Sequence, residues 1–413
     1  MVKVSGNYLI ARTLKEEGVD TLFYLMGGPN FDTIMECQDL GIRTVDFRHE
    51  QAAAMAAHAY SRVTGKPSVV MAASGPGTLN LITGIYTASI DCAPMIILGG
   101  ASAVHEIGRD TFQEVDQVGI MQPLCKYWHR PTMASRFPEV VSTAYRQAQS
   151  GRPGPVYIDC GGDVLYEEVE EDSIPTPSRA LERTRPVATS GDIERAMGLI
   201  ANAERPLLFA GGGAFFSGAA PELEKFVDVT NIPFYTAPMS RGLVPEDHAV
   251  SFQGARSTAM RESDVVLVVG TRMNWMMNYG QRFAPNAKII QIDINEAELG
   301  HNRDIEMGIF GDAKAVMGQL LELAEQRSPD FSGALESPWI VGLREANEKR
   351  MAQTAPLLNS DQIPIHPLRL CKEIDEFLDR DAIISVDGNE ILHFGRQSIS
   401  TYMPGHRLNS GVT

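Results

Sequence analysis

The stretch TVDFRHEQAAAMAAHAYSRVTG at residues 44–65, followed by SVVMAASGPGTLN at residues 68–80, decides the fold of this chain. Its first seven residues have the pattern of a short strand that ends in the acidic residue Glu50, and an alanine-rich helix is predicted directly after it. A second strand then leads into the glycine loop Gly75-Pro76-Gly77. A strand, a helix and another strand in this order form the repeating unit of a parallel α/β sheet.

Glu50 is a candidate site residue, because open α/β sheets bind their ligands outside the carboxyl ends of the strands. Its flanks are apolar, so we expect burial to raise the pKa of its carboxyl group and suit it to proton transfer near neutral pH. The alternative is that Glu50 only stabilises the first turn of the helix through the helix dipole. The glycine loop favours a site, because glycines let the backbone approach a ligand closely.

Length and charge exclude several classes of protein. The 413 residues exceed the size of one hydrophobic core, so about two or three domains are expected. The 36 basic and 52 acidic residues give a net charge of −16, which opposes nonspecific binding to nucleic acid or to an anionic membrane. We therefore expect neither as a partner, and an anionic ligand would need a local cluster of arginines.

The cysteines and the N-terminal sequence indicate the compartment. The five cysteines are scattered and show no CxxC spacing, which is typical of reduced thiols and argues against a zinc site. The first residues, MVKVSGNYLIARTLKEEG, lack the apolar core of a signal peptide. No apolar run is long enough to span a bilayer. We expect a cytoplasmic protein.

Helical and β-rich segments alternate along the chain, which predicts an α/β protein made of doubly wound parallel-sheet domains. We expect a first domain at residues 1–170 and a second at residues 187–330, separated by the charged, proline-containing stretch at 166–186. In the first, strands are expected at residues 21–24, 44–47, 68–72, 95–98 and 156–159, and helices at residues 6–17, 31–39, 51–64, 79–90 and 137–148.

The second and third domains differ in how complete they are. The second has strands that end in glycines or an acid, in PLLFAGGGA, VVLVVGTRMNW and AKIIQIDIN, a pattern that often binds nucleotides. A third domain is expected to start at residues 360–413, with a helix at 367–378 and a strand at 382–386. One helix and one strand cannot form a core, so we interpret this third domain as truncated or completed by another chain.

Several motifs occur in an order that resembles a known family. FRHEQAAAMAAHAYSRVTGKP, SGPGTLN, TFQEVDQ, SGRPGPVYID, APMSRGLVP, GTRMNW and IQIDIN together resemble thiamine-diphosphate-dependent enzymes of the acetolactate synthase superfamily. The segments GARSTAMRESDVVLVVGTRMNWMMNYG and IISVDGNEILHFGRQS are most similar to 2-hydroxyacyl-CoA lyases and oxalyl-CoA decarboxylases. The resemblance covers essentially the whole chain.

The resemblance implies a pyrimidine-binding first domain, a central nucleotide-binding-like domain and a diphosphate-binding third domain. It also implies thiamine diphosphate and Mg²⁺ as cofactors, and an active site shared by two subunits of a homodimer, with a homotetramer as the expected assembly. In the family, a GDG motif and a later asparagine hold the metal. That motif would lie beyond Thr413, so no metal ligand is assigned in this segment.

On the pyrimidine side, Glu50 matches the glutamate that hydrogen-bonds N1′ of the cofactor and so promotes loss of the proton at C2. Gly28, Pro29 and Asn80 match positions that pack on or bond the same end of the cofactor. Family members commonly have a bulky residue at the position of Gly28. Its absence here would admit a branched or ketone-derived substrate. The alternatives are a permissive turn glycine, a turn proline and a helix-start asparagine.

On the substrate side, Phe112 and Gln113 match residues next to the thiazolium ring, with Gly75 placed on the same side and Gln113 assigned as catalytic. Oxalyl-CoA decarboxylases carry a tyrosine and a glutamate at the positions of Phe112 and Gln113, so this chain departs from that activity.

Residues of VDGNE match a segment that approaches the diphosphate and the substrate. Gly388 and Asn389 are assigned to cofactor binding. Glu390 is a candidate proton donor or acceptor for the substrate hydroxyl, and the alternative is a carboxylate that only stabilises the start of a helix.

In the central domain, the arginines Arg152, Arg256 and Arg272 match positions that contact the ADP portion of a bound nucleotide. Asp293 and Asp312 are expected to contact its ribose or adenine. ADP is favoured over FAD as the ligand. The alternative for each residue is a surface ion pair.

The resemblance implies a carbon–carbon lyase or carboligase that splits a 2-hydroxyacyl-CoA into an aldehyde or ketone and formyl-CoA. The alternatives are an acetolactate-synthase-like enzyme that uses free 2-oxo acids and FAD, an oxalyl-CoA decarboxylase, and a noncatalytic paralogue that keeps only the scaffold. An NAD-dependent oxidoreductase has little support, because no GxGxxG follows a first strand.

Overall fold

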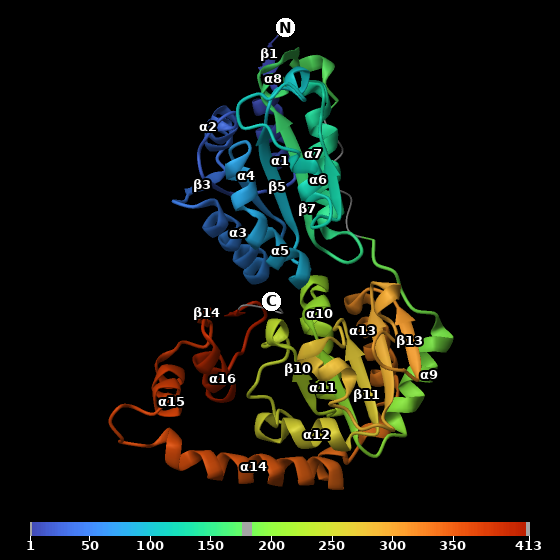
Figure 1. Ribbon diagram of the computed structural model, residues 1–413. Coiled ribbons are helices and arrows are strands. Elements are labelled where there is room, and N and C mark those ends of the chain that lie inside the picture. Colours follow the sequence, from blue (N-terminus) through green and yellow to red (C-terminus); the bar gives the residue numbers. More distant parts are fainter. Residues whose placement is uncertain (1, 176–183, 410–413) are drawn as a thin grey trace. The chain divides into compact units, whose positions relative to one another are not determined.

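The computed structural model describes residues 2–175 and 184–409 (Figure 1). The chain divides into two compact units, with the division between Thr184 and Arg185. Unit 1 is coloured from blue to green in Figure 1, and unit 2 from green to red. Part of the expected linker, residues 176–183, lies outside the described residues.

Unit 1 is built on a six-stranded sheet of order β3-β2-β4-β5-β7-β6, in which all neighbouring strands are parallel. A short antiparallel pair, β1 with β8, lies apart from this sheet. The strands are β1 (Lys3–Ser5), β2 (Thr21–Tyr24), β3 (Arg43–Asp46), β4 (Ser68–Ala72), β5 (Met95–Ala101), β6 (Tyr127–His129), β7 (Pro155–Gly161) and β8 (Glu168–Glu170).

Helices cover both faces of this sheet. The helices are α1 (Gly6–Glu16), α2 (Phe31–Asp39), α3 (Glu50–Thr64), α4 (Pro76–Asn80), α5 (Ile82–Asp91), α6 (Gln117–Met121), α7 (Phe137–Gln149) and α8 (Gly162–Tyr166). Side chains of α1, α2 and α7 form one core with Leu22, Val69 and Ile96 of the strands. Because side chains alternate along a strand, Phe23 points to the other face, where its ring lies 5.6 Å from that of Tyr60 on α3.

Two predictions for this unit were wrong in detail. The single helix expected at residues 79–90 is two helices, because the first begins at Pro76, a residue well suited to the first helical position, and a separate helix begins at Ile82. Strand β6 was not predicted, since three partly exposed residues at the edge of a sheet are too few for a periodic pattern.

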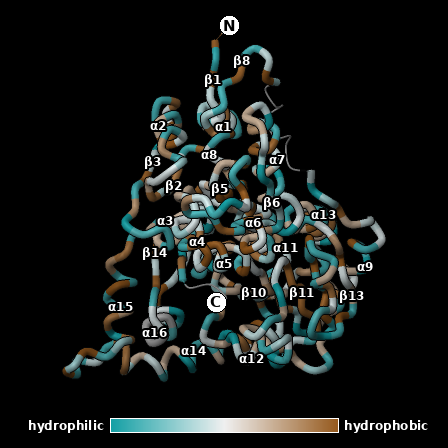
Figure 2. Tube along the Cα trace, turned by 45° about the horizontal axis from the view of Figure 1, so that its top comes forward, coloured by the Kyte–Doolittle hydropathy of each residue, from teal (hydrophilic) through white to brown (hydrophobic). Residues whose placement is uncertain are grey.

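Unit 2 contains a five-stranded parallel sheet of order β10-β9-β11-β12-β13. The strands are β9 (Pro206–Ala210), β10 (Phe234–Thr236), β11 (Val265–Val269), β12 (Lys288–Asp293) and β13 (Met307–Phe310), and the helices are α9 (Ser190–Ala201), α10 (Gly212–Ser217), α11 (Ala220–Thr230), α12 (Arg256–Glu262) and α13 (Ala313–Gln326). Strand β11 is buried along its whole length. Figure 2 colours the Cα trace by the hydropathy of each residue and labels β10, β11 and β13 of this sheet.

The C-terminal segment packs on this unit. It consists of α14 (Pro338–Leu358), α15 (Pro367–Phe377), β14 (Ile384–Ser385), α16 (Asn389–Ser398) and β15 (Arg407–Leu408), and its two strands are parallel. The side chain of Asn347 on α14 accepts a hydrogen bond from Gly254 N–H at 2.8 Å. The α/β fold class with parallel sheets is confirmed, and the division into three domains stays a prediction.

Candidate active site

Glu50 lies at the start of a helix that follows a strand of the parallel sheet. Strand β3 ends at Asp46, and Glu50 is the first residue of α3 rather than the last of the strand. The side chain of His49 caps this helix by accepting from Gln51 N–H at 3.1 Å, so the Glu50 carboxylate is not used as the cap. Glu50 is only 8% exposed, which confirms the expected burial.

Asn80 holds the Glu50 carboxylate in place. Its Nδ2 donates to Glu50 Oε2 at 3.0 Å, and among the described residues it is the one hydrogen-bond donor to this carboxylate. Glu50 Oε1 faces Gly77, where a Cβ atom would lie 3.3 Å from it. A buried acceptor oxygen beside a residue without a side chain fits the N1′ end of an aminopyrimidine ring. The structure thus brings Glu50 and Asn80 together.

Gly28 and Pro29 lie close to the glycine loop. Ser74 N–H donates to the Gly28 carbonyl at 3.1 Å, and the peptide bond between Gly28 and Pro29 is cis. The Pro29 ring packs on Gly100, where a Cβ atom would lie 2.7 Å from Pro29 Cδ. A Cβ atom on Gly28 would meet nothing within 4 Å, so a larger residue would fit in this unit.

Gly75 and Gln113, which were both expected on the substrate side, are in direct contact. Gly75 has a φ of 57°, and a Cβ atom there would lie 2.5 Å from the Gln113 carbonyl oxygen, so only glycine fits. Ser74 Oγ donates to Gln113 Oε1 at 2.6 Å. The neighbouring Phe112 is 82% exposed. Gln113 also lines a small cavity of about 140 Å³, together with Gln117 and residues of the 101–116 segment.

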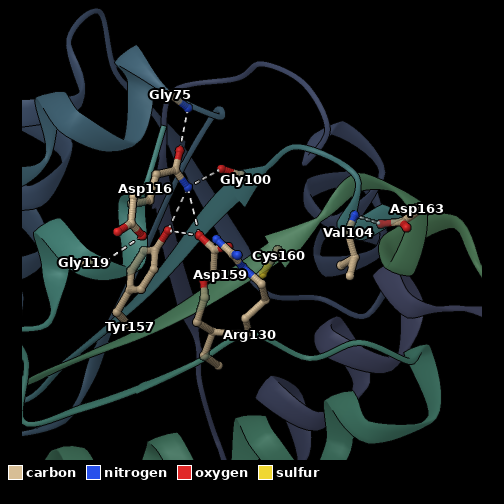
Figure 3. A network of polar contacts seen from close by, with 12 residues as sticks. Gly75, Gly100, Val104, Asp116, Gly119, Arg130, Tyr157, Asp159, Cys160 and Asp163 are labelled. Carbon is tan, nitrogen blue, oxygen red and sulfur yellow. Dashed lines mark hydrogen bonds and ion pairs between the residues drawn. The ribbon is translucent and has the colours of Figure 1, made fainter. Parts of the chain in front are cut away.

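A buried polar network behind Gly75 was not predicted. It joins Gln117 to Gly75, Gly100, Tyr157 and Asp159 (Figure 3). The sequence did carry a signal for it. Asp159 is an acid near the carboxyl end of the strand YID, the kind of placement that made Glu50 a candidate, and Gln117 ends the quoted motif TFQEVDQ.

The VDGNE segment belongs to unit 2, whereas Glu50 and Gln113 belong to unit 1. Gly388, with a φ of 88°, precedes α16, which begins at Asn389. Glu390 is in the first turn of this helix, and the side chains of residues 389–392 lie outside what the structure describes.

Several of the expected nucleotide-binding residues lie at the carboxyl edge of the unit 2 sheet. Arg272 follows β11, Asp293 ends β12, and Asp312 follows β13, and these strands are neighbours. Asp293 Oδ1 accepts from Asn295 N–H at 2.8 Å. Sheet edges of this kind are where open α/β proteins bind nucleotides.

Asp312 has partners within the chain. Its Oδ1 accepts from Arg185 at 2.7 Å, from Ser217 at 2.8 Å and from Ala315 N–H at 3.2 Å, at the start of α13. Burial alone would raise the pKa of Asp312, but these hydrogen bonds outweigh it and lower the pKa. These contacts give Asp312 a structural role, and its contact with a nucleotide stays a prediction.

The expected grouping of Arg152 with the central domain was wrong. Arg152 lies in unit 1, in the connection between α7 and β7, and its Nε donates to Cys92 Sγ at 3.0 Å. The motif match is local in sequence, and the strand PVYIDCG that follows Arg152 pairs with β5 of the unit 1 sheet. Sheet pairing therefore decides which unit carries this arginine.

Arg256 lies among aromatic rings and other arginines. Its NH1 donates to the Thr236 carbonyl at 3.0 Å, and its guanidinium group lies 5.2 Å from the ring centre of Phe209. Burial, followed by the charge of Arg396, lowers the pKa of Arg256 to about 10.

These arginines form a cluster that sequence analysis did not locate. We call Arg241, Arg256, Arg282 and Arg396 the arginine cluster. Burial lowers the pKa of Arg396, and the charges of Arg282 and Arg241 lower it further. Arg282 and Arg396 are exposed, so the cluster is open to solvent. Arg241 is itself paired with Glu246, so Arg256, Arg282 and Arg396 are the members that add positive charge on this otherwise acidic chain.

The described part of the chain has neither a metal-binding cluster nor a membrane-spanning helix. In residues 2–175 and 184–409, no group of three or more His, Cys, Asp or Glu side chains is arranged to hold a metal ion. None of the helices described is both long and apolar enough to cross a membrane.

Comparison with known proteins gives two family matches. Residues 4–120 match the N-terminal TPP binding domain of thiamine pyrophosphate enzymes, and residues 193–320 match the central domain of the same enzymes. The first match contains Glu50, Asn80 and Gln113, and the second contains the unit 2 sheet.

Individual relatives cover nearly the whole chain. Human 2-hydroxyacyl-CoA lyase 1 is 32% identical over 412 residues, which span 99% of this chain and 71% of the relative. A 2-hydroxyacyl-CoA lyase of Arabidopsis thaliana is 33% identical, with 99% and 73% covered. A probable acetolactate synthase large subunit of Methanococcus aeolicus is 34% identical, with 99% and 71% covered. Because such relatives match nearly the whole chain and both domain models fit it, the chain belongs to the family of thiamine pyrophosphate enzymes.

Proposed function

We propose that the protein cleaves the bond between C1 and C2 of a 2-hydroxyacyl-CoA thioester, giving an aldehyde or ketone and formyl-CoA, and joins the same products in the reverse direction. The observation that carries the proposal is the buried Glu50 carboxylate, held by Asn80 beside the glycine loop. Relatives that are 32% and 33% identical and carry the name 2-hydroxyacyl-CoA lyase support the choice of reaction.

Glu50 and its neighbours would act on the cofactor end of the site. When bound, thiamine diphosphate supplies a carbon that adds to carbonyl groups and takes up the electrons of the cleaved bond. Glu50 Oε1 would hold a proton at N1′ of the ring, and Asn80 would keep the carboxylate turned toward that atom. Pro29 and Gly77 would flank the ring, and Gly28 would leave room for the substrate. We expect Mg²⁺ to bind the diphosphate through residues other than those described.

Residues on the substrate side would handle the hydroxyl group. Its proton must leave as the carbonyl product forms, and the formyl carbon must gain a proton, so the site needs a group that exchanges protons there. Gln113, held by Ser74, would orient the hydroxyl group, and Glu390, contributed by the second subunit of the dimer, is the proposed proton carrier. Gly388 and Asn389 would contact the diphosphate.

The arginine cluster favours an acyl-CoA over a small 2-oxo acid. Coenzyme A carries several phosphate groups, and guanidinium groups bind phosphate in a forked geometry. Burial first, and the neighbouring arginines second, lower the pKa values of Arg256 and Arg396, and a bound anion would offset both effects.

A nucleotide site and an assembly complete the proposal. Arg272, Asp293 and Asp312 would contact ADP, since they lie at the edge where such sheets bind nucleotides. Arg256 stays a candidate for its phosphates. We also propose a homodimer, within a homotetramer, that acts in the cytoplasm.

A second candidate is acetolactate-type joining of 2-oxo acids with FAD as an additional cofactor. It is kept because relatives named as probable acetolactate synthases are as similar as the lyases, at 34% and 35% identity. The two candidates differ in substrate, so a direct assay separates them.

The decisive experiment mixes the purified protein with thiamine diphosphate, Mg²⁺ and either 2-hydroxyacyl-CoA thioesters, oxalyl-CoA or pyruvate, and identifies the products by mass spectrometry. We expect formyl-CoA and a carbonyl product, with kcat lowered by about 10²- to 10⁴-fold in Glu50→Gln. Glu139→Gln, an exposed glutamate in the first turn of α7, is the matched control and should keep full activity. Turnover of pyruvate alone would replace the proposal by the second candidate, and absence of cofactor binding would indicate a noncatalytic scaffold.

The arginine cluster can be tested in the same assay. We expect Arg396→Gln to raise the KM for acyl-CoA by about 10-fold, since each lost charged hydrogen bond costs about 1.5–3 kcal/mol, while kcat stays near its original value. Arg195→Gln, which removes an exposed arginine of α9 paired with Glu306, should leave KM unchanged. If the KM for acyl-CoA is the same in both variants, the arginine cluster is not part of the acyl-CoA site.

A further inference from the structure

Gln117 uses both ends of its side-chain amide deep inside unit 1. It is 2% exposed, and its Oε1 accepts from Gly75 N–H at 2.6 Å. Its Nε2 lies 2.9 Å from each of the Gly100 carbonyl, Tyr157 Oη and Asp159 Oδ1. These three partners are labelled in Figure 3, where dashed lines mark the contacts. A carbonyl and a carboxylate can only accept, so the NH₂ end must face them and the oxygen must face Gly75.

The acceptors around Gln117 are themselves fixed. Asp159 is fully buried, and Arg130 Nε donates to its Oδ2, which balances its charge. Tyr157 donates to Asp159 Oδ1, and burial together with the Asp159 charge raises the pKa of Tyr157 well above its usual value, so this donor stays protonated. Rotation of the Gln117 amide would leave buried polar groups without hydrogen-bond partners. Because such groups are costly in free energy, the observed orientation of the amide is strongly favoured.

Gly75 is the junction between the two halves of the site. On one side it precedes α4, whose last residue, Asn80, holds Glu50. On the other side it packs against the Gln113 backbone, and the adjacent Ser74 bonds the Gln113 side chain. Gln117 accepts a hydrogen bond from the Gly75 N–H group and so fixes the position where the two halves of the site meet.

We propose that Gln117 is a positioning residue, which fixes the Gly75 peptide so that the Glu50–Asn80 pair and Gln113 keep the spacing that the reaction needs. The inference rests on the proposed function only for the roles of Glu50 and Gln113. It is distinct from a packing role, because a residue that merely filled space would not need an amide with this orientation.

Gln117→Glu separates positioning from packing. The new carboxyl group has the same size and still accepts from Gly75 N–H, but only its protonated form can donate to Gly100 or Asp159. Burial and the nearby Asp159 carboxylate raise its pKa. The charged and titratable groups that face it or line the adjoining cavity are Asp159, Tyr157, Arg130, Asp116 and Glu114.

We expect kcat of Gln117→Glu to be lowered by up to about 10²-fold at neutral pH and to recover as the pH falls, with KM nearly unchanged. Gln117→Met, which cannot form either bond, should lose kcat at every pH. Gln122→Glu makes the same chemical change at an exposed position just after α6 and should keep the original kcat and pH profile.

A readout that does not depend on turnover is hydrogen exchange of the Gly75 amide. In Gln117→Met we expect exchange about 3- to 10-fold faster than in the unchanged protein, with Gln122→Glu unaffected. If the unchanged protein does not turn over acyl-CoA, the proposed function is contradicted. The exchange measurement still tests whether Gln117 fixes the Gly75 peptide, because it does not depend on turnover. Unchanged Gly75 exchange, or faster exchange with full kcat in the folded variants, would overturn the positioning role.

Discussion

At the scale of single residues, the type of side chain was a better guide to the chemistry of a residue than to its hydrogen-bond partners. Glu50 was predicted from an acid placed at a strand–helix junction, and the structure adds that Asn80 holds it. Asp312 was predicted to contact a nucleotide, and the structure adds Arg185, Ser217 and the start of α13 as partners. Asn80, Arg185 and Ser217 are distant in sequence from the residues they hold, so no local pattern reveals them, whereas the contact of Asp312 with the start of α13 is a local helix cap.

The Asp312 contacts predict a pH-dependent contribution to stability. Because the pKa of Asp312 is lower in the folded state, its contribution is fully present above the unfolded value of about 3.9 and is lost as the pH falls through the folded pKa. We expect Asp312→Asn to lower the free energy of unfolding by about 1–3 kcal/mol at neutral pH, with the difference shrinking below about pH 4.

Urea unfolding at several pH values measures this difference. Asp330→Asn, which removes an exposed carboxylate paired with Arg327, is the control and should change stability by less than about 0.5 kcal/mol. A difference for Asp312→Asn that stays constant down to pH 3 would contradict the assigned partners.

At the scale of elements, regular periodicity gave the long helices, and short or interrupted elements were missed. Helix α2 was predicted with its observed bounds and α3 with one residue fewer, because both have a continuous pattern. The break between α4 and α5 was not seen, since the apolar residues continue through Leu81. That break places Asn80 at the end of a short helix, where it reaches Glu50.

Two glycines on the cofactor side should respond differently to the same substitution. In Gly77→Ala the new Cβ atom would lie 3.1 Å from Ala73 Cβ and 3.3 Å from Glu50 Oε1, so α4 or the carboxylate must shift. We expect kcat to fall by about 10-fold or more, because small displacements of catalytic groups are costly. In Gly28→Ala the new atom meets nothing within 4 Å, so cofactor affinity and kcat on a small substrate should be kept.

Fluorescence titration with thiamine diphosphate and steady-state kinetics with straight and branched substrates test both variants. If Gly28 admits the branched end of a substrate, Gly28→Ala should raise KM for branched substrates alone. Loss of cofactor binding in Gly28→Ala would instead mean that the space around Gly28 is filled in the working enzyme.

At the scale of the whole molecule, a buried ion pair ties the C-terminal segment to the sheet of unit 2. Arg241 donates to both oxygens of Glu246 and to the Ile399 carbonyl, and Glu246 Oε2 accepts from Thr401 N–H at 3.0 Å. The side chains of the pair are only 8% and 4% exposed. The pair therefore links residues about 150 positions apart in the chain.

Removing one partner of this pair should be more harmful than removing both. Arg241→Leu leaves a buried carboxylate without its counter-charge, and we expect a loss of about 3–5 kcal/mol and faster hydrogen exchange at residues 399–401. The double variant Arg241→Leu/Glu246→Leu should recover much of that stability. Arg195→Leu, at an exposed pair with Glu306, should cost less than about 1 kcal/mol. Equal losses of stability in the single and double variants would contradict this prediction, because they would mean that leaving the Glu246 carboxylate without its counter-charge carries no extra cost.

The sequence by itself determined the parallel α/β class, the family and the position of Glu50 beside a glycine loop, because strand and helix periods, glycines and motif order are properties of neighbouring residues. Tertiary structure alone decided that Gln117 holds Gly75 and that Arg241, Arg256, Arg282 and Arg396 gather in unit 2. These contacts join segments far apart in the chain. They exist only after sheet pairing and core packing have brought those segments together, and no local pattern encodes which distant partners will meet.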